Sequence, residues 1–523
     1  MSELIISLLM LAIPLSMLLT AYIIGNKTTA NNGKAIFYVL IANALLLIGA
    51  LTAQTTFSLS LISALSFTTT RIIMLALIVF IGICLVRFCQ NYMAGEPRIN
   101  YFWRWLLTTL SAVTLVVLSN HLILFWLGWL SISLALHKLL MFYPNRPRAA
   151  LAAHKKFIVA RLAETCLFIA FALLYNVHDT WLITEITAAY INNTAELTLS
   201  EQLAGSLIAL AALIKCAQLP LHGWLIQVVE APTPVSALLH AGVINLGGFL
   251  LILFAPLFMQ ATIAQWLVLV VAGLTTVISA LVMTTRVSVK VRLAWSTSAQ
   301  MGLMLLECAL GLFELALMHL VTHSMYKAYA FLNAGNAINE DINRRHAPKH
   351  TPSLADWLRG MIISTVIVSS AWFISGYSGA ISVWLLLTLA LTILIATKHG
   401  IAGRSMLIPI TFIALIATLS YVGLKTLFGL AVDTTAWREA AFSIADIWAI
   451  VLITTLMALS YFLRNQSQHP KVKALSTMLF AGLYLDEWFT RLTLKLWPIR
   501  LPVDKQTNTK HHNQTFIAKE SQL

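Results

Sequence analysis

The sequence predicts an all-α polytopic membrane protein with about 14–15 transmembrane helices. Its 523 residues are 59% hydrophobic and only 10% charged, whereas an ordinary soluble domain carries roughly 25% charged residues. The mean hydropathy is +0.83, and apolar runs long enough to cross ~30 Å of hydrocarbon recur along almost the whole chain. This composition excludes a soluble protein. It also places the net charge of +14 in loops beside a membrane and not on a nucleic-acid surface.

The predicted spans follow one another at short intervals. The first runs from about Leu4 to Gly25, and it lacks both a positive n-region and a small-residue cleavage site. It is therefore interpreted as a span and not as a removed signal peptide. The candidate spans begin near Leu4, Ala35, Arg71, Trp105, Leu122, Phe157, Leu203, Val235, Ile263, Leu293, Phe313, Leu358, Ile381, Met406 and Ser443.

The cysteines point to packing and not to a disulfide or metal framework. The five are Cys84, Cys89, Cys166, Cys216 and Cys308. All lie inside apolar runs and no two form a CxxC pair, which argues against a disulfide framework, a zinc knuckle or an iron–sulfur site.

The basic residues indicate the orientation. Most Lys and Arg residues fall in the odd-numbered connections, including Lys155, Lys156 and Arg161 after the fifth span, and in the segment after the last span. Acidic residues such as Asp179 and Glu185 fall in even-numbered connections. By the positive-inside rule the odd side is cytoplasmic, which puts the N-terminus outside and the C-terminus inside.

The chain changes character after Arg464. The run LSTMLFAGLYLDEWFTRLTLKLW has apolar residues at helical spacing but is too charged to span a membrane. It predicts an amphipathic helix that lies on the membrane or on a partner. Pro498 and Pro502 end this helix, and the polar tail after them is predicted to be disordered.

Ionisable groups inside spans are costly and are functional candidates. Lys215 ends an apolar run beside an interruption at Pro220 and Gly223. Burial favours the neutral amine, so such a lysine can exchange a proton near neutral pH. Interrupted helices at membrane depth mark ion sites in transporters. The alternatives are a lysine that snorkels to the interface and an ordinary helix end.

Two further groups of charges lie inside spans. Arg161 and Glu164 are three residues apart, so they share a helix face and can pair. That pair is either structural or functional. Glu307 is a lone carboxylate in an apolar run, and the sequence leaves open whether it is buried or lies near the interface.

His319, His323 and Lys327 follow at steps of four residues, which keeps them near one helix face. Because histidine titrates near neutrality, the row predicts a proton relay through the membrane. The alternatives are packing histidines, a metal pair, and haem ligation by His240 with His319 or His323. No HExxH motif or third ligand accompanies a metal pair.

Two stretches resemble the proton-translocating subunits of respiratory complex I and Mrp-type antiporters. They are AQLPLHGWLIQVVEAPTPVSALLHAGVINLGG and VKVRLAWSTSAQMGLMLL followed by HLVTHSMYKAYAFL. The resemblance implies two inverted five-helix repeats, each with a broken helix, and a polar axis near the bilayer midplane. By motif, that axis falls on Lys215, Arg161, Glu164, His240, Lys290, His319, His323 and Lys327.

The sequence departs from that pattern in two places. No carboxylate lies between Asn120 and Tyr143, where the resemblance implies a glutamate, and the spans from Leu358 to Ala396 hold no buried lysine. The stretches HKLLMFYPNRPRAALAAHKKFIVARLAE and GLYLDEWFTRLTLKLWPIRLP are more similar to the DabB family, the membrane subunits of DAB inorganic-carbon accumulation systems.

This second resemblance implies a bacterial inner-membrane transporter subunit and not an enzyme. The chain would conduct protons or sodium and hold no cofactor, and a large DabA-like zinc-containing cytoplasmic partner would hydrate CO₂. The alternatives are a respiratory or antiporter subunit, a haem-binding oxidoreductase and a non-conducting scaffold. The expected divisions are 1–104, a first repeat at 105–260, a second at 261–400, further spans at 401–464 and the cytoplasmic segment 465–523.

Overall fold

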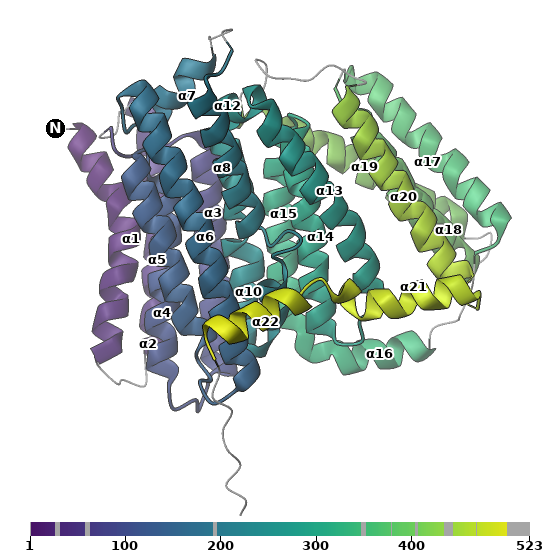
Figure 1. Ribbon diagram of the computed structural model, residues 1–523, viewed down its shortest axis with the longest axis horizontal. Helices are drawn as coiled ribbons and strands as arrows, with labels where there is room; N and C mark the ends of the chain where they lie inside the picture. Colours follow the sequence, from purple (N-terminus) through teal and green to yellow (C-terminus); the bar gives the residue numbers. More distant parts are fainter. Residues whose placement is uncertain are drawn as a thin grey trace, which may run out of the picture.

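The computed structural model describes residues 2–26, 32–57, 63–191, 196–346, 352–377, 379–402, 406–432, 443–466 and 468–498. Within these ranges the chain forms helices with no β-strand, apart from two isolated bridges between Leu65 and Ser119 and between His121 and Leu182. The long helices stand side by side (Figure 1), which confirms the predicted all-α fold. The polar tail predicted after Pro502 lies outside the described residues.

Eleven helical segments in these ranges are long and apolar enough to cross a membrane. They are α1 (Ser2–Asn26), α2 (Asn32–Phe57), α3 (Thr69–Tyr92), α4 (Ile99–Leu118), α5 (Leu122–Leu140), α6 (Pro147–His178), α10 and α11 (Thr233–Leu238 and Leu246–Leu253, joined by the π-helical turn η2, Leu239–Val243), α13 (Thr262–Thr284), α17 (Leu354–Ser375), α19 (Leu407–Gly429) and α20 (Ile444–Asn465). Four more helices occupy the remaining predicted spans. They are α8 (Leu199–Lys215), α14 (Val289–Ala309), α15 (Phe313–Leu332) and α18 (Ser382–Ala402).

Short elements lie at the two ends of this bundle (Figure 1). Helices α7 (Ile183–Ile191) and α12 (Ala255–Gln260) lie at one end. The helix α16 (Ala337–His346), which follows the 3₁₀ turn η3 (Asn333–Asn336), lies at the other end.

The eighth helix is interrupted inside the protein. Helix α8 ends at Lys215, and the chain resumes as α9 (Gly223–Gln227) and η1 (Val228–Glu230) after a cis Leu219–Pro220 bond. Neighbouring helices satisfy the freed backbone groups, as membrane depth requires. Leu219 N–H donates to Thr275 Oγ1 at 3.1 Å, and Ser298 Oγ donates to the Ala217 carbonyl at 3.1 Å. In the second half, α17, α18, α19 and α20 run without interruption over the described residues.

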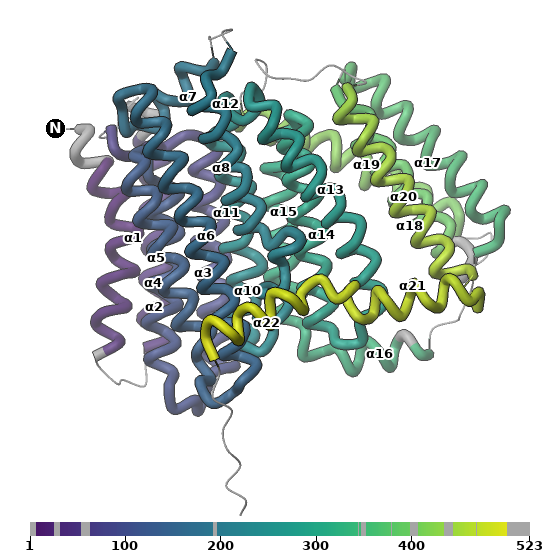
Figure 2. The backbone as a smooth tube through the Cα atoms, viewed as in Figure 1, coloured from purple at the N-terminus to yellow at the C-terminus, as the bar shows by residue number. Residues whose placement is uncertain are grey.

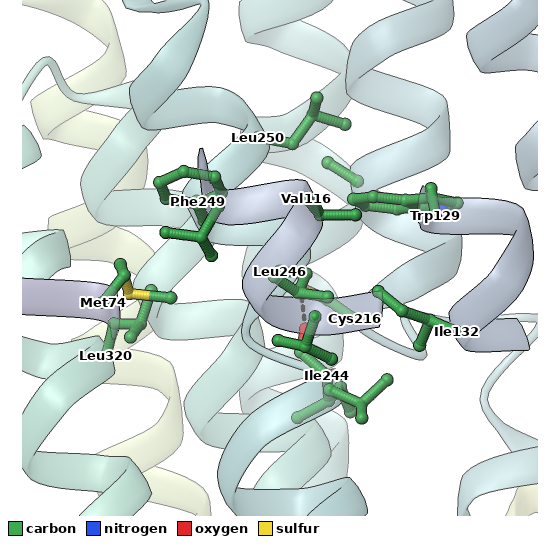
Figure 3. Close-up of a cluster of buried hydrophobic side chains, with 14 of the residues drawn as sticks. Met74, Val116, Trp129, Ile132, Cys216, Ile244, Leu246, Phe249, Leu250 and Leu320 are labelled. Carbon is green, nitrogen blue, oxygen red and sulfur yellow. Dashed lines mark hydrogen bonds between the residues drawn. The ribbon is translucent and has the colours of Figure 1, made fainter. Parts of the chain in front are cut away.

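The best-packed part of the molecule surrounds this interruption. In the apolar stretch of the span Thr233–Leu253, 94% of the residues are buried. In the apolar stretch of α19, only 11% of the residues are buried. Helices α17 to α20 form a separate group at one side of the bundle (Figure 2). Figure 3 shows the packing at the break, where Cys216 Sγ donates to the Ile244 carbonyl at 3.3 Å. All five cysteines are free, and all but Cys84 are buried, as their apolar surroundings predict.

The C-terminal segment lies across the bundle, roughly at right angles to the spans (Figure 1). The sequence predicts one amphipathic helix here, and that prediction is wrong in detail. Two helices form, α21 (Pro470–Phe480) and α22 (Glu487–Leu496), separated by the turn η5 (Gly482–Tyr484). The turn breaks the helix because Gly482, Leu483 and Tyr484 all have positive φ angles, of 69°, 54° and 55°. We call residues 470–497 the strap.

Candidate ion pathway

A cluster of charged side chains lies between α5, α6 and α8. Arg161 Nη2 lies 2.7 Å from Glu164 Oε2, and Arg161 also donates to the Ser133 hydroxyl. The glutamate is 3% exposed, so its charge is balanced inside the protein, as a buried carboxylate requires. The predicted pair therefore forms, and it contacts Ser133 of α5, the helix in which the resemblance implies a glutamate. We call Lys156, Arg161, Glu164 and Lys215 the first node.

Lys215 faces this pair from the last turn of α8. Its Nζ lies 4.4 Å from the centre of the Trp129 ring, a cation–π distance. Lys215, Glu164 and Lys156 line one small cavity that offers about 20 Å³ to the centre of a water molecule, which is room for about one water. Lys215 is half-buried, its ammonium faces the cavity of the node, and a single water there can connect it to the other groups.

Lys156 is a member of the first node that the sequence analysis did not identify. Lys155 and Lys156 were predicted to lie in a cytoplasmic loop, yet both are buried, at 0% and 5% exposure. The reason is that α6 starts at Pro147, about ten residues before the predicted span, because proline at the first helical position favours a helix start. Lys156 Nζ donates to the Ser133 carbonyl at 2.6 Å.

A second group of ionisable residues lies between η2 and α15, and we call His240, His323 and Lys327 the second node. The His240 ring stacks on Phe331, with centroids 4.3 Å apart. Lys327 Nζ donates to the Leu293 carbonyl at 3.0 Å and to Ser296 Oγ at 2.8 Å. Both ring nitrogens of both histidines are buried without a hydrogen-bond partner. Buried polar groups are normally satisfied, so these four nitrogens are open to water or a moving proton.

The turn η2 joins the two nodes. Val243 of this turn lines the cavity of the first node, while His240 of the same turn stacks against α15. A π-helical turn inside an α-helix is rare and occurs frequently at functional sites. One turn of π-helix therefore contacts both nodes, through an apolar side chain at the first node and an imidazole at the second.

Beyond the second node, His319 connects His323 to the buried carboxylate of Glu307. His319 and His323 have ring centroids 6.0 Å apart. His319 Nδ1 lies 3.0 Å from both carboxylate oxygens of Glu307, and its Nε2 lies 2.9 Å from Gln300 Oε1. Glu307 is 5% exposed, so it is buried among the helices, and it lies in the last turn of α14, which ends at Ala309.

Lys290 does not lie in this row. It sits in the first turn of α14, where its Nζ donates to Thr233 Oγ1 at 2.7 Å. The resemblance places Lys290 on the polar axis, but the described contacts place it beside the start of α10.

A further lysine that the sequence analysis overlooked lies inside α19. Lys425 Nζ lies 4.0 Å from Glu314 Oε1 and 3.3 Å from the centre of the Tyr377 ring. Glu314 is 3% exposed. Lys425 interrupts an apolar run of α19, LSYVGLKTLFG, so the rule that identifies Lys215 would also have identified it.

The described residues offer little for a metal. No group of three or more His, Cys, Asp or Glu side chains is arranged to hold an ion in the parts of the chain that the structure describes. Both ring nitrogens of His319 are engaged by Glu307 and Gln300, so His319 has no free nitrogen for a metal pair or for haem.

Comparison with known proteins identifies related chains. Residues 119–387 match the membrane family described as NADH:quinone oxidoreductase/Mrp antiporter. The chain is 49% identical over 437 residues to the probable inorganic carbon transporter subunit DabB of Hydrogenovibrio crunogenus, which covers 83% of each protein. It is 36% identical over 441 residues to DabB2 of Halothiobacillus neapolitanus, covering 82% of this chain and 79% of that protein.

A solved structure shares the fold. The Mrp complex from Dietzia sp. DQ12-45-1b contains a chain that matches with a TM-score of 0.55. The match covers 100% of this chain and 60% of that chain at 18% identity. At that identity the likeness concerns the arrangement of helices alone, and it agrees with the observed helical membrane fold.

Proposed function

The chain belongs to the NADH:quinone oxidoreductase/Mrp antiporter membrane family and, within it, to the DabB subunits, and we propose that it is the ion-conducting subunit of a two-subunit pump that accumulates inorganic carbon. The observation that carries this proposal is the set of ionisable groups, buried or half-buried between the helices, that form the first node, the second node and the His319–Glu307 pair. Such groups are costly inside a membrane and mark ion pathways and proton relays. A scaffold that only anchored a partner would have no use for them.

The chemistry of the row favours protons over sodium. Sodium, like other hard cations, is held by oxygen ligands. The second node instead presents an ammonium and two imidazoles, and four unpartnered ring nitrogens. Imidazole accepts and releases protons near neutral pH, whereas the charge of Lys327 repels a cation. One water per gap would connect neighbouring members, since His319 and His323 have ring centroids 6.0 Å apart.

We assign the remaining parts by charge and by similarity. The chain would lie in a bacterial inner membrane with the strap on the cytoplasmic side, because the basic connections gather there. The partner would be a large zinc-containing subunit that hydrates CO₂, as proposed for DabA-like proteins. This chain would supply the energy by letting protons move down their gradient.

Substitution of Lys215 tests the proposal. Lys215→Ala should reduce carbon uptake by about 100-fold, the usual contribution of a positioned proton-transfer group. Insertion and partner binding should remain, since the side chain makes no ion pair with the strap. Lys138→Ala is the matched control, because Lys138 is an exposed lysine near the end of the neighbouring helix α5. Uptake at the wild-type level in Lys215→Ala would remove the lysine from the mechanism.

A further inference from the structure

We infer that the strap is a working part of the ion pathway and that Asp486 is its positioning residue. This inference rests on the proposed function of the first node. Asp486 would hold α6 and the interrupted helix together, so that docking of the strap sets the geometry around Lys215. The strap would then be more than a surface for a partner.

The contacts begin with a buried cation. The Lys155 side chain is 0% exposed, and its Nζ lies 2.6 Å from Asp486 Oδ2 and 2.6 Å from Thr490 Oγ1. A buried ammonium needs a close counter-charge, and removal of one partner of such a pair is strongly destabilising. The counter-charge comes from a residue 331 positions later in the chain. The strap therefore neutralises a charge inside the membrane domain.

The same carboxylate reaches the interrupted helix. Gln227 Nε2 of α9 donates to Asp486 Oδ2 at 3.1 Å. At Gly223, the first residue of α9, a Cβ would lie only 1.6 Å from Asp486 Oδ1. The carboxylate can approach this closely only because Gly223 has no side chain. Asp486 thus contacts both α6 and the segment directly after the break.

A ring contact fixes the end of the strap. The Trp497 ring lies parallel to the His154 ring, with centroids 3.9 Å apart and planes inclined by 5°. Phe489 of α22 is 3% exposed. These contacts hold α22 on α6, as Figure 1 shows for the two helices. The docked position is therefore specific and not a loose association with the membrane.

These anchors are directly adjacent to the first node. Lys155 precedes Lys156, which lines the cavity of Lys215. Gly223 and Gln227 belong to the helix that resumes after Lys215. A shift of Asp486 would move the start of α9 and the Lys155–Lys156 turn of α6 together. Both elements form walls of the first node, so the strap can tune the node without touching Lys215.

The test separates positioning from attachment. Deletion of the strap would remove both roles at once, so a point substitution is needed. Asp486→Asn keeps the size of the side chain and removes its charge. We expect at least a tenfold loss of proton flux in the reconstituted two-subunit complex, normalised to inserted complex, with unchanged co-purification of the partner. Glu487→Gln is the matched control, because Glu487 is the neighbouring acid of the strap and its ion pair among the described residues is with exposed Arg491 on the same helix, at 3.1 Å. It should stay within twofold of wild type.

A second variant and a tether complete the experiment. Gly223→Ala leaves every charge in place but displaces the carboxylate, and it should also lower flux at least tenfold. A bismaleimide tether between cysteines placed at His154 and Trp497 should hold the strap on α6 in the Asp486→Asn background. If Asp486 positions the node, the tether leaves flux low. Full recovery of flux by the tether would overturn the inference and reduce Asp486 to an attachment point.

Measuring Lys215→Ala in parallel distinguishes a failure of the proposed role of the strap from a failure of the proposed function. Normal flux in Asp486→Asn together with lost flux in Lys215→Ala would overturn the role of the strap alone. Normal flux in both variants would overturn the proposed function as well.

Discussion

The first and second nodes both contain a buried lysine, but they balance its charge in opposite ways. In the first node, Lys215 and Lys156 share a cavity with the carboxylate of Glu164, which is itself paired with Arg161. In the second node, Lys327 is bonded to a neutral carbonyl and a hydroxyl, and its neighbours are imidazoles without partners. Breaking a buried ion pair leaves an uncompensated charge, whereas an unpartnered imidazole can be removed without leaving one.

Because of this difference, we expect substitutions in the two nodes to affect protein stability and ion conduction to different degrees. Arg161 and Glu164 of the first node stabilise the fold as well as carrying charge, so substitutions in this pair should affect both abundance and flux. The histidines of the second node make no hydrogen bond in the described structure, so their substitution should affect flux more than abundance. In the absence of a carboxylate in α5, Glu164 of α6 is the acid that lines the cavity of Lys215.

The largest effect should come from the centre of the second node. His323→Ala should reduce flux by about 100-fold with little loss of protein, because the side chain carries proton transfer and makes no hydrogen bond in the described structure. The measurement is uptake normalised to membrane-inserted protein. A large loss of yield with normal specific uptake would make His323 a packing residue.

His319 should behave differently from His323. His319→Ala should lower yield as well as flux, because it leaves Glu307 buried without its 3.0 Å partner, at a cost of about 1–3 kcal/mol. In the double variant the flux should fall no further than in His323→Ala, since members of one path are non-additive. Additive loss of flux would indicate two independent routes.

Glu164→Gln should have an intermediate effect on flux and a strong effect on stability. The amide keeps the shape but leaves the cations of the first node without a carboxylate, which costs about 3 kcal/mol or more. We expect a loss of flux smaller than that in His323→Ala, and a lower midpoint temperature for unfolding in detergent. An unchanged midpoint would show that Arg161 and the lysines find other counter-charges.

The smallest effect should come from Lys290. Its Nζ bonds to Thr233 and lies outside both nodes, so Lys290→Ala should change normalised uptake by less than about twofold, within the range of ordinary surface substitutions. A loss as large as that of His323→Ala would extend the pathway to the first turn of α14.

Much of the fold followed from hydropathy alone, since each of the fifteen predicted spans corresponds to a helix or helix pair. Lys215 and the row of His319, His323 and Lys327 followed from the cost of burying charge in an apolar run. Lys155 and Lys156 could not be placed in this way, because Lys155 is paired with Asp486, 331 residues later, and Lys156 bonds to Ser133 of the neighbouring helix α5. Pairing between distant segments leaves no periodic signal in either of them.

The contact between His319 and Glu307 could not be predicted from the sequence either, although the two residues are close in the chain. Glu307 and His319 lie on the two arms of the α14–α15 hairpin, 12 residues apart. Glu307 and His319 each lie in an apolar run of the sequence. The contact between them cannot be inferred from those runs, because it depends on how the hairpin turns at Gly311. Lys425 is a different case, because the apolar run around it is plain in the sequence and the sequence analysis overlooked it.

The central claim is that protons cross the membrane through this chain by way of Lys215. It is tested most directly by proton entry into liposomes that carry the reconstituted two-subunit complex and an internal pH dye, under an imposed pH gradient with and without Na⁺. The account predicts a dye response in the wild type that Na⁺ does not change, and a response in Lys215→Ala no larger than that of empty liposomes. A wild-type response that requires Na⁺, or an equal response in Lys215→Ala, would contradict it.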